Sequence, residues 1–265
     1  MSLAAPTLPA GRYRLRNVVR SEAIKVLTLP STAITLGLTV VAGLLVTALV
    51  SHGACFRGFG FDSTLVALTG MIVAGLAGGV FGALLITGEY SSGTVRATLS
   101  ATPRRPMVLA AKVVVTAVIM VGFCEVLSFA SFFLGEAVLS GRGAPTATLG
   151  SPNALRAVLM TGLFIALLAL MSFGFGLICR NAAGAIASFA GVVFVLPLVM
   201  HAVSQSTVRY LPTNILTNSV MSTVNQGGGP GGTGPLSAGV GLLLMAVYAT
   251  AALVAGAVLF MNRDA

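Results

Sequence analysis

Six apolar runs, each long enough to cross a lipid bilayer, constrain the fold of this chain more than any other feature. A membrane-spanning helix needs about 20 apolar residues, because each residue advances the helix by about 1.5 Å. The hydrocarbon core also requires every backbone N–H and C=O to be paired within the protein, which a helix achieves by itself. The runs cover about residues 32–50, 65–87, 113–140, 153–178, 182–203 and 237–261. We therefore predict an all-α membrane protein with six transmembrane helices.

The composition agrees with this prediction and excludes an ordinary globular domain. Hydrophobic residues make up 56% of the chain and charged residues only 8%, and the mean hydropathy is +1.00. A soluble domain has about 25% charged residues. The net charge of +9 would suggest nucleic acid as a partner of a soluble chain, but in a membrane protein the positive-inside rule explains it better. We expect no nucleic-acid binding.

The distribution of lysine and arginine predicts the orientation of the six spans. If the N-terminus is cytoplasmic, eleven basic residues lie inside and four lie outside. The inner ones are Arg12, Arg14, Arg16, Arg20, Lys25, Arg96, Arg104, Arg105, Lys112, Arg180 and Arg263; the outer ones are Arg57, Arg142, Arg156 and Arg209. We therefore place both termini in the cytoplasm. The predicted organisation is a cytoplasmic N-terminus (1–30) and a six-span domain (31–265), with an inner loop at 88–112 and an outer loop at 204–236.

A charged amphipathic segment precedes the first span. Residues 12–29 predict a helix on the membrane surface, with one apolar side and with Arg20 and Lys25 on the remainder. Pro30 ends this helix, and Ser31 or Thr32 is suited to cap the next one. Glu22 falls near the middle of the apolar side, so it needs a basic or hydrogen-bonding partner. The alternative is that the segment is only a cationic anchor beside the membrane.

The polar segment between the second and third spans stands out from its apolar surroundings. The second span is expected to end at Thr87 or Gly88, and a short helix is expected from Thr94 to Ser100, stopped by Pro103. This helix would carry an apolar pair, Val95 and Leu99, which suits docking into a groove of a partner protein. The simpler alternative is that every inner loop of a membrane protein is polar and basic.

Two glutamates lie inside the third apolar run. Glu125 is twelve residues beyond Val113, which places it about 18 Å along the helix, near the middle of the membrane. Glu136 lies about three turns further on nearly the same face, and Ser128 lies one turn from Glu125. A carboxyl group at this depth is a functional candidate, either as a polar wall of a transport pathway or as a proton-linked site. The alternative is a structural acid that is hydrogen-bonded between helices.

The residues give no indication of catalytic, cofactor or metal chemistry. The cysteines at positions 55, 124 and 179 and the two histidines have no ligand-like spacing. There is no phosphate-binding Gly-x-x-x-x-Gly-Lys-Ser/Thr sequence, and the glycine-rich stretch at 227–232 lacks the lysine. We therefore predict that the chain is not an enzyme and holds no cofactor of its own.

Several motifs, in order along nearly the whole chain, resemble those of permease subunits of type-2 (export class) ABC transporters, especially from high-GC Gram-positive bacteria. The segment 88–112 carries the most specific match. The surface helix departs from the family's usual Lys-Leu-Arg continuation, because Lys25-Val26-Leu27 lacks the second basic residue. The matching stretches are Arg20-Ser21-Glu22-Ala23-Ile24-Lys25, Gly88-Glu89-Tyr90-Ser91-Ser92-Gly93-Thr94-Val95-Arg96, Thr102-Pro103-Arg104-Arg105 with Lys112, Arg180-Asn181-Ala182-Ala183-Gly184 and Leu211-Pro212-Thr213-Asn214.

The resemblance implies a mechanical role. Two six-span permease copies, most simply a homodimer in the bacterial plasma membrane, would form the pathway above two ATPase subunits, which bind the ATP and Mg. The segment 88–106 would be the main coupling helix and the 179–183 turn a second contact. The residues at these contacts would be Glu89, Tyr90, Gly93, Thr94, Arg96, Arg104, Arg105, Arg180 and Asn181, although Arg104 and Arg105 would equally suit anionic lipid.

The sequence leaves alternatives open for the cargo and for the energy source. A mostly apolar lining would suit a lipid, a peptide or a hydrophobic drug or antibiotic. The principal alternative is a proton-coupled secondary transporter that uses Glu125 and needs no ATP. Such a transporter is expected to show repeats with broken helices near the membrane centre, and no such repeat is evident in the sequence.

Overall fold

The computed structural model describes residues 15–55, 61–94, 105–203, 205–220 and 236–262, and every element within these ranges is a helix. Six helical segments are long and apolar enough to cross a membrane, which confirms the predicted fold class. The elements are α1 (Leu15–Thr28), α2 (Pro30–Gly53), α3 (Ser63–Leu68), α4 (Gly70–Ser91), α6 (Arg105–Gly141), α7 (Ala154–Cys179), α8 (Ala182–Ala190), the π-helix η1 (Gly191–Val195), α9 (Leu196–Val203), α10 (Gln205–Val208), α11 (Pro212–Val220) and α12 (Ala238–Asn262).

Several helix boundaries differ from the expected ones, and α6 begins at Arg105 and not near residue 113. Pro30 is the first residue of α2, and the extended residue Leu29 precedes it without a side-chain cap, so neither Ser31 nor Thr32 caps this helix. Proline suits this position because its fixed φ angle fits the helix and its missing N–H would have no partner there. Helix α4 continues to Ser91, one turn beyond the expected end at Thr87 or Gly88. This extra turn carries Glu89 and Tyr90.

The fifth span is irregular one turn before its proline. Proline within a membrane helix favours a kink, and this span contains Pro197, but the π-helix η1 already interrupts the α-helix just before that residue. A π-helix shifts the hydrogen-bonding pattern by one residue and leaves carbonyl groups that need other partners. The hydroxyl of Thr213, on the short helix α11, donates a hydrogen bond to the carbonyl oxygen of Val193 within η1. The short helix therefore supports the irregular span.

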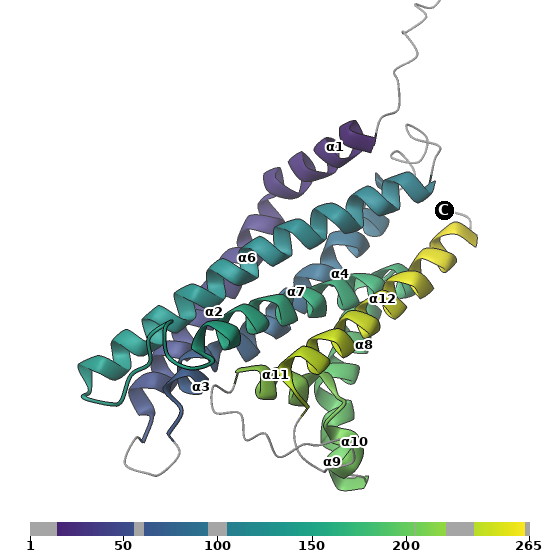
Figure 1. Ribbon diagram of the computed structural model, residues 1–265. Helices are drawn as coiled ribbons and strands as arrows, with labels where there is room; N and C mark the ends of the chain where they lie inside the picture. Colours follow the sequence, from purple (N-terminus) through teal and green to yellow (C-terminus); the bar gives the residue numbers. More distant parts are fainter. Residues whose placement is uncertain (1–14, 56–60, 95–104, 204, 221–235, 263–265) are drawn as a thin grey trace, which may run out of the picture.

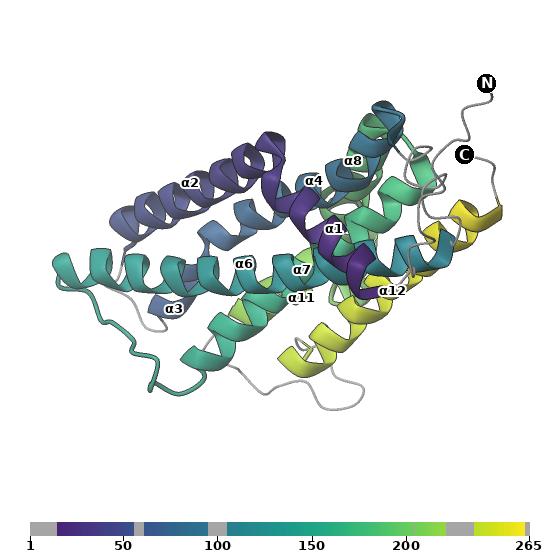
Figure 2. The same ribbon diagram turned by 90° about the horizontal axis from the view of Figure 1, so that it is seen from above.

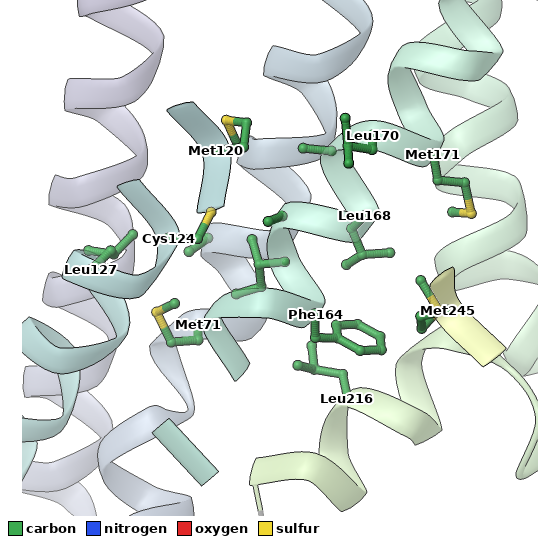
Figure 3. Close-up of a cluster of buried hydrophobic side chains, with 14 of the residues drawn as sticks. Met71, Met120, Cys124, Leu127, Phe164, Leu168, Leu170, Met171, Leu216 and Met245 are labelled. Atoms are coloured by element: carbon green, nitrogen blue, oxygen red, sulfur yellow. The ribbon is translucent and has the colours of Figure 1, made fainter. Parts of the chain in front are cut away.

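Helix α7 occupies the centre of the bundle and is the most buried of the six spans. It packs against α4 and α12 along much of its length, and also against α6, α8 and α11. Figure 3 shows the result: Phe164 and Leu168 of α7 lie among side chains from the helices around it. The other labelled members of this core are Met71, Met120, Cys124, Leu127, Leu170, Met171, Leu216 and Met245.

Glycines allow α4 to approach its neighbours closely. A Cβ atom on Gly82 would lie 2.1 Å from the carbonyl oxygen of Ala169 in α7, and one on Gly79 would lie 2.0 Å from the ring of Phe189 in α8. Gly78 and Gly82 are four residues apart, as are Gly75 and Gly79, which is a pattern of small residues that allows close helix contact. In this span the pattern serves packing within the chain.

Helix α2 has the reverse of the polarity seen in soluble proteins. Its buried residues are small or hydroxylated, whereas large aliphatic residues such as Leu38 and Leu45 are exposed. On the buried side, Ser131 of α6 donates to the carbonyl oxygen of Ala67 over 2.9 Å, and the hydroxyls of Thr47 and Ser131 are 2.7 Å apart. This arrangement suits a helix between a lipid phase and a protein interior, because polar groups need partners that only the protein supplies.

Both views place the ends of several helices at one end of the bundle. Figures 1 and 2 show α1, the C-terminal ends of α4 and α12 and the N-terminal end of α6 gathered there. In Figure 2, α1 turns away from the axis of α2 and lies across α6, against which it packs. A small apolar cluster from four spans (Ile86, Leu109, Phe173, Leu177 and Phe260) fixes the helix ends. We refer to this region as the α1 end.

Candidate functional site

Four charged side chains from three helices form a closed network at the α1 end, which we call the charge cluster. It consists of Glu22 and Lys25 of α1, Glu89 of α4 and Lys112 of α6. The Lys112 ammonium donates to Glu22 Oε2 over 2.5 Å and to Glu89 Oε1 over 2.6 Å. The Lys25 ammonium donates to Glu22 Oε1 over 3.2 Å and to Glu89 Oε1 over 3.0 Å. Each lysine therefore bridges both carboxylates.

Helical spacing and charge balance explain why these residues can be buried. Glu22 and Lys25 are three residues apart, so they share one face of α1, and Glu89 lies in the last turn of α4. Glu22 is 2% exposed and Lys112 is 7% exposed, whereas the Lys25 side chain is 33% exposed. A buried charge is tolerated only with compensating partners. Two positive and two negative charges give that compensation and tie α1 to both spans.

The charge cluster supplies the basic partners that Glu22 was expected to need. Lys25 was assigned to the amphipathic helix, but the more buried partner with the shorter contacts is Lys112, which was expected only as a basic residue of the inner loop. A lysine within a strongly apolar run is the signal that could have identified it. Arg20, also assigned to the amphipathic helix, is exposed two residues before Glu22 and does not join the cluster.

The environment of Lys25 gives a prediction for alkaline pH. Burial lowers the pKa of Lys25. Its hydrogen bond to Glu89 and the charges of Glu89 and Glu22 raise the pKa by a larger amount, so the pKa lies above the ordinary value of 10.5. A lysine whose pKa is higher in the folded than in the unfolded protein contributes its full stabilisation at pH values below the unfolded-state pKa. This stabilisation is lost as the pH rises through the folded-state pKa. We expect the wild type to lose more stability than Lys25→Arg above pH 10.5, because arginine stays charged. The test is to measure thermal denaturation midpoints of both proteins at a series of pH values, from neutral pH to above pH 10.5. Equal decreases in the midpoints of the two proteins would contradict the prediction.

A second contact connects the end of α4 with the turn between α7 and α8. The Arg180 guanidinium carbon lies 5.5 Å from the centre of the Tyr90 ring, a geometry that favours a cation–π interaction. Arg180 ends α7 in the left-handed conformation with a φ of 54°, and Asn181 begins α8 by accepting a hydrogen bond from the Ala183 N–H over 2.9 Å. The two segments that the sequence predicted to be inner loops are therefore neighbours.

The structure describes some of the other residues that were predicted to couple to the ATPase. Gly93 has a φ of +69°, so it turns the chain after α4 where a side chain would be strained. Thr94 follows, with its hydroxyl 3.0 Å from that of Ser92. Arg96 and Arg104, together with the expected helix from residue 94 to 100, lie outside the described residues. Arg105 begins α6, but its side chain also lies outside them.

The residues predicted inside the membrane have separate environments. Glu125 is half-buried on α6 opposite Gly162 of α7, where an added Cβ would lie 2.7 Å from its carboxyl carbon, so the glycine makes room for this acid. Ser128 is fully buried and donates to the carbonyl oxygen of Val158 over 2.8 Å. Glu136 is 8% exposed and accepts a hydrogen bond from the Ala147 N–H over 2.9 Å, which holds the loop after α6.

Comparison with known proteins agrees with this architecture. A comparison with curated proteins gives no match. A family model described as "ABC-2 family transporter protein" matches residues 24–265. This range includes the Tyr90–Arg180 contact, all six spans and three members of the charge cluster (Lys25, Glu89 and Lys112), whereas Glu22 lies two residues before it. The family consists of membrane translocation subunits of ABC transporters, which pair with ABC ATPase subunits. The chain, an integral membrane protein with six apolar helices, therefore belongs to the ABC-2 family of transporter permeases.

Proposed function

We propose that this chain is the permease subunit of an ATP-driven exporter and that it receives force from its ATPase at the α1 end. One observation carries the proposal: the charge cluster and the Tyr90–Arg180 contact connect α1, α4, α6 and the α7–α8 turn at the two segments expected to meet the motor. A displacement of residues 88–94 would therefore move several helices together. The cargo class that fits an apolar pathway is a lipid, a peptide or a hydrophobic drug or antibiotic.

The proposed orientation places the α1 end in the cytoplasm of a bacterial cell. Arg16 and Arg20 are exposed on α1, and Arg180 lies beside Tyr90 at the same end of the bundle. Basic residues concentrate on the cytoplasmic side of membrane proteins, so this arrangement supports the assignment. In this orientation both termini are cytoplasmic and the protein spans the plasma membrane.

The proposed assembly contains two copies of this chain and two ATPase subunits, which bind the ATP and Mg. Glu89, Tyr90, Gly93, Thr94 and Arg96 would hold the coupling segment in position. Arg104 and Arg105 would contact either the motor or anionic headgroups, and Arg180 and Asn181 would form the second contact. ATP-driven closure of the motor pair would push on both segments and switch the pathway between inward and outward access.

A second candidate function rests on Glu125. One of its carboxylate oxygens is buried without a hydrogen-bond partner among the described residues. A carboxyl group in this state at membrane depth suits proton binding, and a proton-coupled transporter would use it without ATP. Transport that persists without ATP and stops in Glu125→Gln would favour this alternative.

The coupling proposal can be tested by co-purification with a matched pair of tyrosine variants. Tyr90→Leu removes the ring beneath Arg180 while keeping apolar volume, whereas Tyr210→Leu removes a similar contact, with Arg209 at 4.8 Å, on the segment before α11. We expect tagged wild type from native membranes to carry an ATPase, identified by mass spectrometry. The amount of ATPase that co-purifies with Tyr90→Leu should be about three- to tenfold lower than with the wild type, consistent with the usual strength of a cation–π contact. Tyr210→Leu should recover the wild-type amount.

Two outcomes would contradict the coupling proposal. One is wild-type protein that leaves the membrane alone and still transports or binds its cargo without ATP. The other is an equal loss of ATPase recovery in the Tyr90→Leu and Tyr210→Leu variants.

A further inference from the structure

A cavity of about 400 Å³ lies beside the charge cluster, between α1, α2, α4 and α6. This volume falls within the range of about 300–1,000 Å³ that is typical of small-molecule sites. The cavity is open to the surroundings along the side where Leu29 and Leu84 are partly exposed, at 43% and 36%. It lies where α1 meets the spans, and with α1 on the membrane surface, as its amphipathic sequence predicts, the cavity would lie near the boundary between headgroups and acyl chains.

The lining of this cavity changes from charged to apolar along the axis of the bundle. Glu22, Lys25, Glu89 and Lys112 line the end nearest α1. Phe81, Leu84 and Leu85 of α4 line the part further into the membrane, and Phe81 is two helical turns from Glu89, or about 12 Å along the helix. A ligand that fills the whole cavity must therefore be amphiphilic, with a polar head at the charge cluster and an apolar tail.

The charge cluster, whose four residues line the cavity, leaves hydrogen-bonding capacity unused. Both lysines donate to Oε1 of Glu89. Its Oε2 atom accepts no hydrogen bond from any of the described residues. An ammonium has three N–H donors, and Lys25 uses two of them on Glu22 and Glu89. The hydroxyl of Thr116, which is 1% exposed and lines the same cavity, also has no partner among the described residues. The site therefore offers an acceptor and donors together.

We propose that this cavity binds one phospholipid with a zwitterionic, primary-ammonium headgroup, of the phosphatidylethanolamine type. The lipid ammonium would donate to Glu89 Oε2, its phosphate would accept from Lys25, and one acyl chain would pack against Phe81 and Leu84. The cluster has two acidic and two basic groups, so its charge sums to zero and complements a neutral zwitterion better than a net anion. A choline headgroup has no N–H to donate, so it cannot make the same contact with Glu89.

This binding site needs no ATPase partner, so it stands independently of the proposed coupling. The bound lipid would contact four helices at once and hold α1 against the spans. Since α1 carries half of the charge cluster, the lipid would stabilise the same contacts that connect the α4 and α6 ends.

Native mass spectrometry of the purified, delipidated chain gives a direct test. The protein is titrated with three lipids that share identical acyl chains and carry ethanolamine, choline or glycerol headgroups. We expect one ethanolamine lipid to saturate each chain, with binding about tenfold or more tighter than for the other two, since a charge-assisted hydrogen bond is lost in each comparison. Equal binding of the three headgroups would overturn the proposal.

Wall variants locate the bound lipid without altering the charge cluster. Thr35→Trp, on α2, and Leu84→Trp, on α4, each place a large ring in the cavity, whereas Ile34→Trp adds the same ring outside it at the same depth, where the native side chain is 62% exposed. We expect the first two variants to lose the saturable ethanolamine lipid and Ile34→Trp to retain it. Retention of one lipid in either wall variant that elutes as a single species would overturn the assignment to this cavity.

Discussion

Replacing Lys112 by methionine is expected to destabilise the protein by about 3–5 kcal/mol, because it leaves two carboxylates to share one lysine in a buried position. Glu22 is 2% exposed and loses its shortest contact, at 2.5 Å. Glu89 loses the contact at 2.6 Å as well. The remaining partner, Lys25, has a side chain that is 33% exposed and makes longer contacts with both acids. The cluster would then carry an uncompensated negative charge.

The free energy of unfolding can be measured by denaturant titration of the purified protein in mixed micelles. Lys25→Met is the matched control, since it removes the same charge from the same two carboxylates at a more exposed position, and it should cost clearly less. The double variant Glu89→Gln with Lys112→Met restores charge balance and should recover part of the loss. A Lys112→Met protein as stable as the wild type, or less affected than Lys25→Met, would show that burial of the cluster does not control its energetics.

Replacing Gly82 by alanine is the second change for which we expect a large effect. The added methyl group would lie 2.1 Å from the carbonyl oxygen of Ala169, far inside van der Waals contact. The obstacle is backbone in the middle of α7 and has no rotamer to change, so α4 and α7 must separate. These two helices share one of the most extensive contacts in the bundle. We expect a loss near the upper end of the range of about 1–3 kcal/mol for overpacking.

Gly122→Ala provides the matched control for this experiment. Gly122 lies within the third span on α6, and an added Cβ there meets nothing within 4 Å. The same chemical change should therefore be neutral or slightly stabilising, because alanine is the better helix former. The same unfolding titration compares both variants with the wild type. Equal stability of Gly82→Ala and Gly122→Ala would mean that α4 and α7 are not in close contact in the folded protein.

The local properties of the chain were predictable from the sequence. Six apolar runs determine six helices, since a polypeptide in hydrocarbon must satisfy its own backbone hydrogen bonds. The position of Glu22 on an apolar face shows that this acid needs a partner, because an unpaired charge costs too much there. The polar segment after the second span and the Arg180 turn were likewise recognisable as interruptions of an apolar chain. These conclusions depend only on short stretches of sequence.

The identity of the partners was decided only by the tertiary structure. Lys112 is 90 residues from Glu22, Ala169 is far from Gly82 in the sequence, and the cavity needs residues from four helices. In a soluble protein the apolar face of a helix shows which side packs. In a membrane span, lipid and protein interior accept the same aliphatic side chains, so Leu38 is exposed while Thr47 is buried on the same helix. The faces that meet are therefore set by close fit and by a few polar contacts, and these appear only once the helices are packed.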